Sequence, residues 1–143
     1  MSKNIIEVAD NLERLRPTEP ATPEQIAEAE KKLGLKFADD YKELLSKYNF
    51  LYAKNIEIYG ISDEKTEDTV KVTLYMREND YAAPKNMYVI ENVGVDGWLT
   101  WQAEDGTVYY KAPWEEPQKT ADSLAEHIER VVLECMDDDD DDF

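Results

Sequence analysis

The first part of the chain carries apolar side chains at the spacing of an α-helix. They recur every three or four residues and predict three helices, over residues 4–15, 23–33 and 38–48. The second helix has the clearest bounds, because Thr22 and Gln25 form a capping-box sequence that leads into it. Pro23 suits its first position, and Gly34 is a typical residue directly after a helix. Three amphipathic helices are therefore expected in this part of the chain.

Beyond the third helix, the apolar positions follow the spacing of β-strands. Strands are predicted over residues 56–61, 70–76 and 87–90, followed by a hairpin over 96–110. The segment VKVTLYM alternates apolar residues with polar or aromatic ones, as a half-buried strand does. A last apolar stripe predicts a helix over residues 121–136, with Thr120 as its cap.

The hairpin DGWLTWQAEDGTVYY contains two tryptophans and two tyrosines. Asp105-Gly106 is a strong signal for a two-residue turn, and this turn pairs Trp101 with Tyr110. The opposite face then mixes two aromatic with two polar residues: Trp98, Tyr109, Thr100 and Gln102. An exposed aromatic side chain among polar ones is typical of a binding hot spot. A helix or loop that covers this face would instead make it core, and the sequence leaves both interpretations open.

The order of helices, then strands, then one helix predicts the fold class α+β. Helices are expected to pack on a mostly antiparallel β-sheet, with a helical N-terminal part, a β-meander and a closing C-terminal helix. The chain has 143 residues, which suits a single domain over residues 1–136. The aspartate run that follows repels itself and buries no apolar surface, so residues 137–143 are predicted to form a disordered acidic tail.

Charge is the strongest feature of the composition. The chain has 16 basic and 33 acidic side chains and a net charge of −17. Such a chain repels phosphate backbones, so nucleic acid is not an expected partner. It attracts a basic protein and accelerates their encounter. The alternative is that the acidity only keeps the protein soluble.

Other features of the composition indicate a cytoplasmic protein. No apolar run approaches the roughly 18 residues of a membrane span, so no membrane association is expected. Acidic residues interrupt the N-terminal segment, which therefore does not resemble a signal peptide. Cys135, the single cysteine, excludes an internal disulfide.

The sequence offers little for catalysis. His127 and Cys135 lie on the same predicted helix about 12 Å apart, too far for a catalytic dyad. We expect His127 at the edge of the apolar stripe and Cys135 within it. No glycine-rich phosphate loop or nucleophile motif is present. A hydrolase would need two carboxylates in a cleft, and no pair stands out. We therefore expect no enzyme activity, catalytic residues, metal or cofactor.

The aromatic residues near acidic ones are the candidates for binding a protein partner. Trp114 repeats the chemistry of the hairpin, since two glutamates follow it directly. The predicted partner-binding residues are Trp98, Tyr109, Glu104, Asp105, Trp114, Glu115 and Glu116.

Several motifs between residues 21 and 134 occur in an order that characterises one family. They are Ile26 and Glu30 in a capped helix, Leu33-Gly34, Asp40-Tyr41, Leu44-Leu45, Gly60, the hairpin ENVGVDGWLTWQAEDGTVYY and the closing helix ADSLAEHIERVV. In this order they resemble the SUKH superfamily of SMI/KNR-like proteins.

The resemblance implies a non-enzymatic protein. Bacterial members of the superfamily are immunity proteins, which bind and neutralise a toxin, and many such toxins act on nucleic acids. The resemblance therefore implies a cognate toxin with a basic surface as partner. Eukaryotic relatives act as regulatory scaffolds, which is the alternative function. The family implies no catalytic residues, and its partner-binding residues vary, so no site residue is transferred from it.

Overall fold

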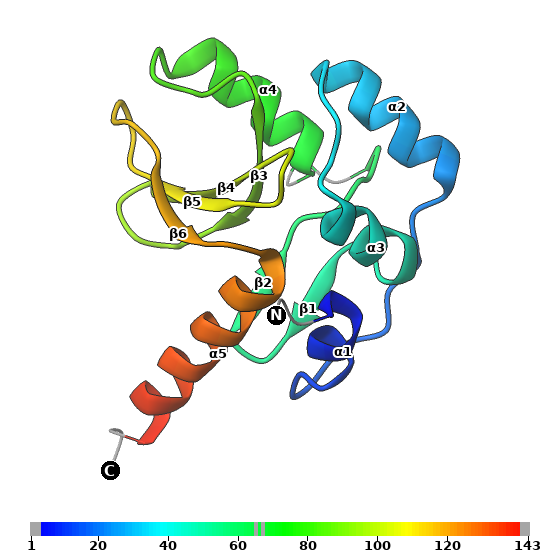
Figure 1. Cartoon of the computed structure of the whole chain (residues 1–143), viewed down its shortest axis with the longest axis vertical. Coiled ribbons are helices and arrows are strands. Elements are labelled where there is room, and N and C mark those ends of the chain that lie inside the picture. Colours follow the sequence, from blue (N-terminus) through cyan, green and yellow to red (C-terminus); the bar gives the residue numbers. More distant parts are fainter. Residues whose placement is uncertain (1–3, 65, 67, 141–143) are drawn as a thin grey trace.

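The computed structural model is an α+β fold, as predicted (Figure 1). It describes residues 4–64, 66 and 68–140, with only the backbone described for 135–140. In chain order the elements are α1 (Ile5–Asp10), α2 (Pro23–Leu33), α3 (Asp39–Lys47), β1 (Leu51–Ala53), β2 (Ile56–Ile58), α4 (Thr69–Asn79), β3 (Met87–Asn92), β4 (Leu99–Ala103), β5 (Val108–Lys111), β6 (Gln118–Ala121) and α5 (Leu124–Asp140).

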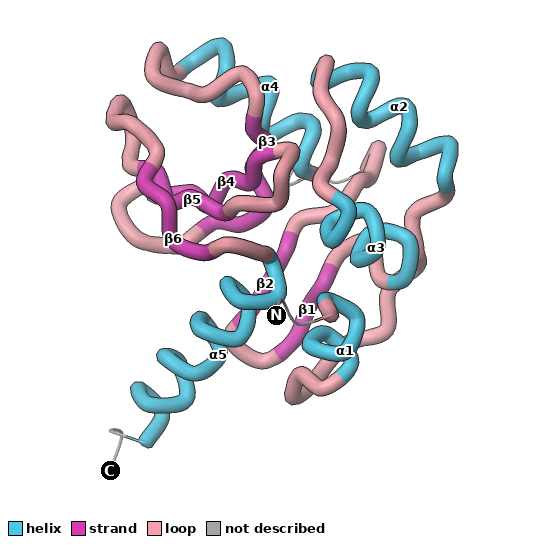
Figure 2. Tube along the Cα trace, in the orientation of Figure 1, coloured by secondary structure: helices cyan, strands magenta, loops and turns pink. Residues whose placement is uncertain are grey.

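The main sheet is an antiparallel meander in which β3, β4, β5 and β6 are neighbours in sequence order. The strands β1 and β2 form a separate two-stranded sheet (Figure 2). One hydrogen bond of 2.7 Å joins the two sheets, from the N–H of Tyr59 to the carbonyl of Ile90. That carbonyl is accessible because the pairing of β3 with β4 shifts between Val89 and Glu91.

Both faces of the main sheet are covered. On one face, Val89 and Trp101 are fully buried and pack with Val72 and Met76 of α4. On the other face, Tyr88 and Ile90 join the larger core with α2, α3 and α5. The sheet accordingly lies between α4 and α5 (Figure 1). The face that the sequence left open is therefore not a free binding surface.

The strand predicted over residues 70–76 is wrong, because this segment belongs to helix α4. Asp68 caps the helix, with its carboxylate 2.7 Å from the N–H of Lys71. The buried positions follow helical spacing but include the polar residues Thr69 and Thr73. The outer face in turn carries Leu74 and Tyr75, which are exposed. The apolar pattern thus does not mark the buried face, which explains the error.

The two buried threonines of α4 bind the open edge of β3. Thr69 Oγ1 donates to the carbonyl of Val89 at 2.5 Å, and the N–H of Val89 donates to Thr73 Oγ1 at 2.8 Å. Both backbone groups of one edge residue are therefore satisfied without another strand. This contact fixes α4 against the sheet.

The predicted hairpin register is also wrong, by one residue. Trp101 pairs with Tyr109, not with Tyr110. The turn contains three residues, 104–106, and ends at Gly106 with φ +98°, a conformation that favours glycine. The shift moves Tyr109 to the Trp101 face and Tyr110 to the opposite face.

Several predicted bounds change. The helix over 4–15 is confirmed in part and ends at Asp10, because Glu13 and Arg16 instead form backbone hydrogen bonds with Lys54 and Tyr52 beside β1. The helices over 23–33 and 38–48 are confirmed, with the predicted capping box present. Strands β1 and β6 are additions to the prediction.

The closing helix begins at Leu124, since Thr120 lies in β6 and is not its cap. The side chain of Ser123 accepts from the N–H of Glu126 at 3.2 Å at this end. At the other end α5 extends to Asp140, and residues 141–143 of the predicted tail lie outside the described residues.

His127 was predicted at the edge of the apolar stripe, and the structure shows that it is fully buried there and not at a boundary with solvent. Its Nε2 atom lies 2.8 Å from Oε1 of Glu91, and the same oxygen accepts from Thr100 Oγ1 at 2.7 Å. The ring of Tyr110 packs edge-on against His127. This cluster joins α5 to strands β3, β4 and β5.

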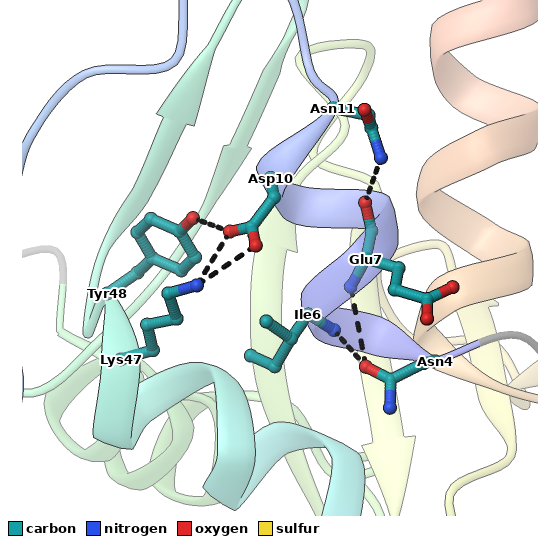
Figure 3. A network of polar contacts seen from close by, with 7 residues as sticks. All are labelled: Asn4, Ile6, Glu7, Asp10, Asn11, Lys47 and Tyr48. Carbon is teal, nitrogen blue, oxygen red and sulfur yellow. Dashed lines mark hydrogen bonds and ion pairs between the residues drawn. The ribbon is translucent and has the colours of Figure 1, made fainter.

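The short helix α1 is held to the end of α3 by one carboxylate (Figure 3). Lys47 Nζ lies 2.9 Å from both oxygens of Asp10, and the hydroxyl of Tyr48 donates to the same group. These bonds hold the pKa of Asp10 below its usual value, and the bond from Tyr48 has a larger effect than the bond from Lys47. Burial and the carboxylate raise the pKa of Tyr48 to about 12.

Candidate protein-binding surface

The seven residues predicted to bind a partner do not form one surface. They divide between the two ends of the β4–β5 hairpin, with Tyr109 between them. The turn end carries Glu104 and Asp105, and the open end carries Trp98, Trp114, Glu115 and Glu116. A strand advances about 3.3 Å per residue, so the two ends are roughly 20 Å apart.

The turn end forms an acidic hollow with the starts of α3 and α5. Its acidic residues are Asp39, Asp40, Glu104, Asp105 and Asp122. Most of these carboxylates already have partners within the chain. Glu104 accepts from the N–H of Lys36 at 2.9 Å, and Asp122 pairs with Lys119. The N–H of Thr107, 2.9 Å from Asp105, holds the pKa of that carboxyl below its usual value. These carboxylates therefore stabilise the loops around the hollow through contacts within the chain.

Two solvent-exposed aromatic rings stack at the open end of the hairpin. Trp114 lies over Tyr81, with ring centroids 5.7 Å apart and an interplanar angle of 17°. Tyr81 is 86% exposed and Trp114 is 54% exposed. Glu115 and Glu116, both exposed, follow Trp114 directly. We call the stacked rings of Tyr81 and Trp114 the aromatic platform.

A buried carboxylate holds the two loops that carry the rings of the platform. Asp80 directly precedes Tyr81, and its Oδ1 atom accepts from the N–H of Ala82 at 2.9 Å. Its Oδ2 atom accepts from the N–H of Trp114 at 3.1 Å and from Lys111 Nζ at 2.5 Å. One side chain thereby fixes the backbone around Tyr81 and at Trp114.

The Asp80–Lys111 pair is an ion pair removed from water. The two side chains are 2% and 1% exposed. Burial opposes the charged form of Asp80, but the bonds from Lys111, Trp114 and Ala82 outweigh it and keep the pKa of the carboxyl below its usual value. Lys111 also donates to the carbonyl of Ala112 at 3.2 Å. Both members of the ion pair therefore have hydrogen bonds beyond the one that joins them, which compensates part of the cost of their burial.

The backbone of Trp114 is strained. Its φ angle is +67°, a region in which a residue with a Cβ costs about 1–2 kcal/mol. The hydrogen bond from its own N–H to Asp80 offsets this cost. Strained residues of this kind cluster at functional sites.

The remaining predicted residues lie in different surroundings. Tyr109 is half-buried and packs in the cluster of Trp101, so the structure places it largely in the core. Trp98 is half-buried at the start of β4, where Gly97 packs against Pro113. The platform is thus composed of one predicted residue, Trp114, and one that the sequence did not indicate, Tyr81.

A model of the SUKH_5 family, described as SMI1-KNR4 cell-wall, matches residues 2–133 of the chain. The chain belongs to the SUKH superfamily. The match covers almost the whole chain, in agreement with the motifs identified in the sequence. A comparison with curated proteins gave no match.

The SUKH motifs have structural roles in this chain. Glu30 accepts from the N–H of Phe37 at 2.8 Å and so closes the loop after α2. Asp40 accepts from Gln102 Nε2 and from the N–H of Leu124, both at 3.0 Å, and thereby joins α3 to the hairpin and to α5. These motifs therefore define the fold and leave the binding surface unspecified.

Gly60 owes its place to a close approach of two segments. A Cβ there would lie 2.7 Å from the backbone of Asn49, the residue that follows α3. Asn49 in turn binds Ile61, accepting from its N–H at 2.7 Å and donating to its carbonyl at 2.8 Å. The Asn49 side chain therefore requires glycine at position 60.

No three histidine, cysteine or carboxylate side chains among the described residues are arranged to hold a metal ion. Within the same part of the chain, no helix combines the length and apolar character needed to cross a membrane.

Proposed function

We propose that this SUKH protein is a non-enzymatic immunity protein of the cytoplasm. It binds and neutralises a cognate protein toxin that has a basic surface, such as a nuclease. The observation that carries this proposal is the aromatic platform, which is exposed and held in place in a chain of net charge −17.

The charge and the platform act on different steps of binding. Long-range attraction between an acidic and a basic protein raises the association rate and weakens with salt. Aromatic anchors instead slow dissociation, because they exclude water from the centre of an interface. The chain has both features, so it suits rapid and durable inhibition of a basic protein.

The SUKH superfamily supports the proposal, since its members include immunity proteins and it is not a known enzyme family. A second candidate function is a regulatory or scaffolding module that has no toxin partner. The description of the matching family, SMI1-KNR4 cell-wall, favours this alternative.

The test is to isolate the partner and measure its toxicity. The tagged chain is used to capture proteins from lysate of its native cell, with washes at low and at high salt. Captured proteins are identified by mass, and each is expressed in a sensitive host with and without this chain. The immunity function requires that one of them arrests growth alone and that co-expression of this chain restores it.

One control and one alternative outcome make the result decisive. An unrelated protein of similar acidity shows which proteins bind through charge alone. A partner that survives the high-salt wash but leaves growth unchanged excludes the toxin role and supports the scaffolding function.

A further inference from the structure

We propose that the aromatic platform is a binding site for an arginine side chain of the partner, with Glu115 and Glu116 as its counter-ions. The inference rests on the proposed function only in taking the partner to be a basic protein. It is carried by the exposure of the two rings, by the way they are held and by the charge beside them.

The rings present π faces, not an apolar pocket. Tyr81 is the outer ring, and with 86% of its surface exposed it leaves one face free. A cation over such a face is attracted by the negative charge of the π system. Arginine suits the position better than lysine, because its planar guanidinium stacks on an aromatic ring while its N–H groups bind carboxylates.

The carboxylates needed for this contact are available. Asp80 is committed to Lys111 inside the protein, whereas Glu115 and Glu116 are exposed and follow the inner ring in sequence. A purely apolar partner residue would gain nothing from two adjacent glutamates and would desolvate them. The surroundings of the platform therefore favour a cationic side chain.

The platform is also prepared before binding. The backbone bonds to Asp80 fix the loops that carry both rings, so little backbone entropy is lost when a partner docks. The strain at Trp114 is already offset in the free protein. A site with these properties can hold one side chain firmly although it is small and open.

The experiment titrates the full-length protein with the peptide acetyl-Gly-Arg-Gly-amide and records the indole N–H signals of its tryptophans by NMR. The matched peptide contains citrulline, which has the shape of arginine without its charge. We expect the Trp114 signal to move with the arginine peptide and hardly at all with the citrulline peptide, while the signal of buried Trp101 stays fixed. Equal responses to both peptides, or a Trp114 signal that does not move, would overturn the proposal.

Matched variants locate the site. Tyr81→Leu keeps apolar bulk but removes the π face, and its control is Tyr75→Leu on α4, where the tyrosine is 63% exposed. We expect Tyr81→Leu to lower the affinity for the arginine peptide about two- to fivefold, which is the effect of one exposed cation–π contact. The control variant should leave this affinity unchanged. Neither side chain is buried, so both variants should fold. A loss of affinity that is equal in the two variants would contradict the site.

The counter-ions have their own pair of variants. Replacing both Glu115 and Glu116 by Gln should lower the affinity for the arginine peptide by a similar factor. Replacing Glu24 and Glu43, two exposed glutamates on α2 and α3, by Gln removes the same charge away from the platform and should leave the affinity unchanged. Equal losses would mean that only net charge matters, which contradicts a specific site.

The proposal and the proposed function can fail separately. If a toxin is found and Tyr81→Leu neutralises it as well as the native chain does, the platform is not the site, while the immunity function stands. If the peptide results hold but the captured partner is not toxic, the immunity function fails and the arginine site stands.

Discussion

At the scale of single residues, three buried or half-buried carboxylates connect segments that are far apart in the sequence. Asp80, Glu91 and Asp40 are each bonded to groups from distant elements. None of these contacts has a local sequence signal, because the partners are brought together by the fold. This is why the sequence made Trp114 a candidate through its neighbours, whereas it gave no signal for Tyr81, whose stacking partner lies 33 positions away.

The buried ion pair gives the first prediction. Asp80→Asn leaves the ammonium group of Lys111 buried without its counter-charge, which typically costs about 3–5 kcal/mol in the free energy of unfolding. The control is Asp122→Asn, which breaks an exposed pair with Lys119 and should cost far less, because solvent screens exposed charges. Urea denaturation of both variants measures the difference. Similar costs would mean that Lys111 finds another partner or water.

The second prediction concerns the contact between Asp10 and Tyr48. The folded pKa of Asp10 is lowered, so its contribution to stability is present above about pH 3.8 and is lost as the pH falls below that value. The folded pKa of Tyr48 is raised to about 12, so its contribution is complete below about pH 10 and is lost between pH 10 and 12.

The variant Tyr48→Phe tests both the loss of stability at acid pH and the loss at alkaline pH. The stability difference between the native chain and this variant should be constant from about pH 4 to 10 and shrink on either side. Chemical denaturation across this range measures it, with Tyr75→Phe as the control for an exposed tyrosine. A difference that does not change with pH would show that the hydroxyl and the carboxylate do not interact in solution.

At the scale of elements, those with local sequence signals were predicted correctly, whereas those that depend on contacts between distant residues were not. Helix α2 was predicted accurately because its capping box, proline and glycine are local signals. Helix α4 was predicted as a strand because its inward threonines bind β3 while Leu74 and Tyr75 face outward. The hairpin was identified from Asp105-Gly106, but the length of its turn is not encoded in that pair. The short strands β1 and β6 carry too few residues for a pattern.

The docking of α4 provides the third prediction. Thr73→Val preserves shape but leaves the buried N–H of Val89 without an acceptor, which costs about 1–3 kcal/mol in the free energy of unfolding. Thr73→Ser keeps the hydroxyl and should lose little of this hydrogen bond. Hydrogen exchange of the Val89 amide reports on the bond directly. An amide equally protected in both variants would contradict its role.

At the scale of the whole molecule, the negative charge is unevenly placed. Helix α5 extends away from the body of the protein toward the C-terminus (Figure 1). Its described part ends in the aspartates at positions 137–140, which lie away from the sheet. We propose that the run extends the electrostatic reach of the protein toward a basic partner.

The last prediction tests this role of the aspartate run. A chain ending at Met136 should associate with its partner more slowly than the full chain at low salt, and equally fast at high salt, since salt screens exposed charges. Stopped-flow mixing measures both rates. Replacing the aspartates by serine keeps the length of the run and should have the same effect as its removal. An unchanged rate at low salt would show that the run is passive.

The way Asp80 holds the platform separates the architecture of the site from its specificity. Its carboxylate binds main-chain N–H groups at positions 82 and 114 and the ammonium of Lys111, and it touches neither ring by a hydrogen bond. The side chains at positions 81 and 114 can therefore be exchanged while the loops that present them stay closed. Under the proposed function, a collection of variants randomised at these two positions, on an otherwise unchanged chain, is a route to chains that bind other proteins.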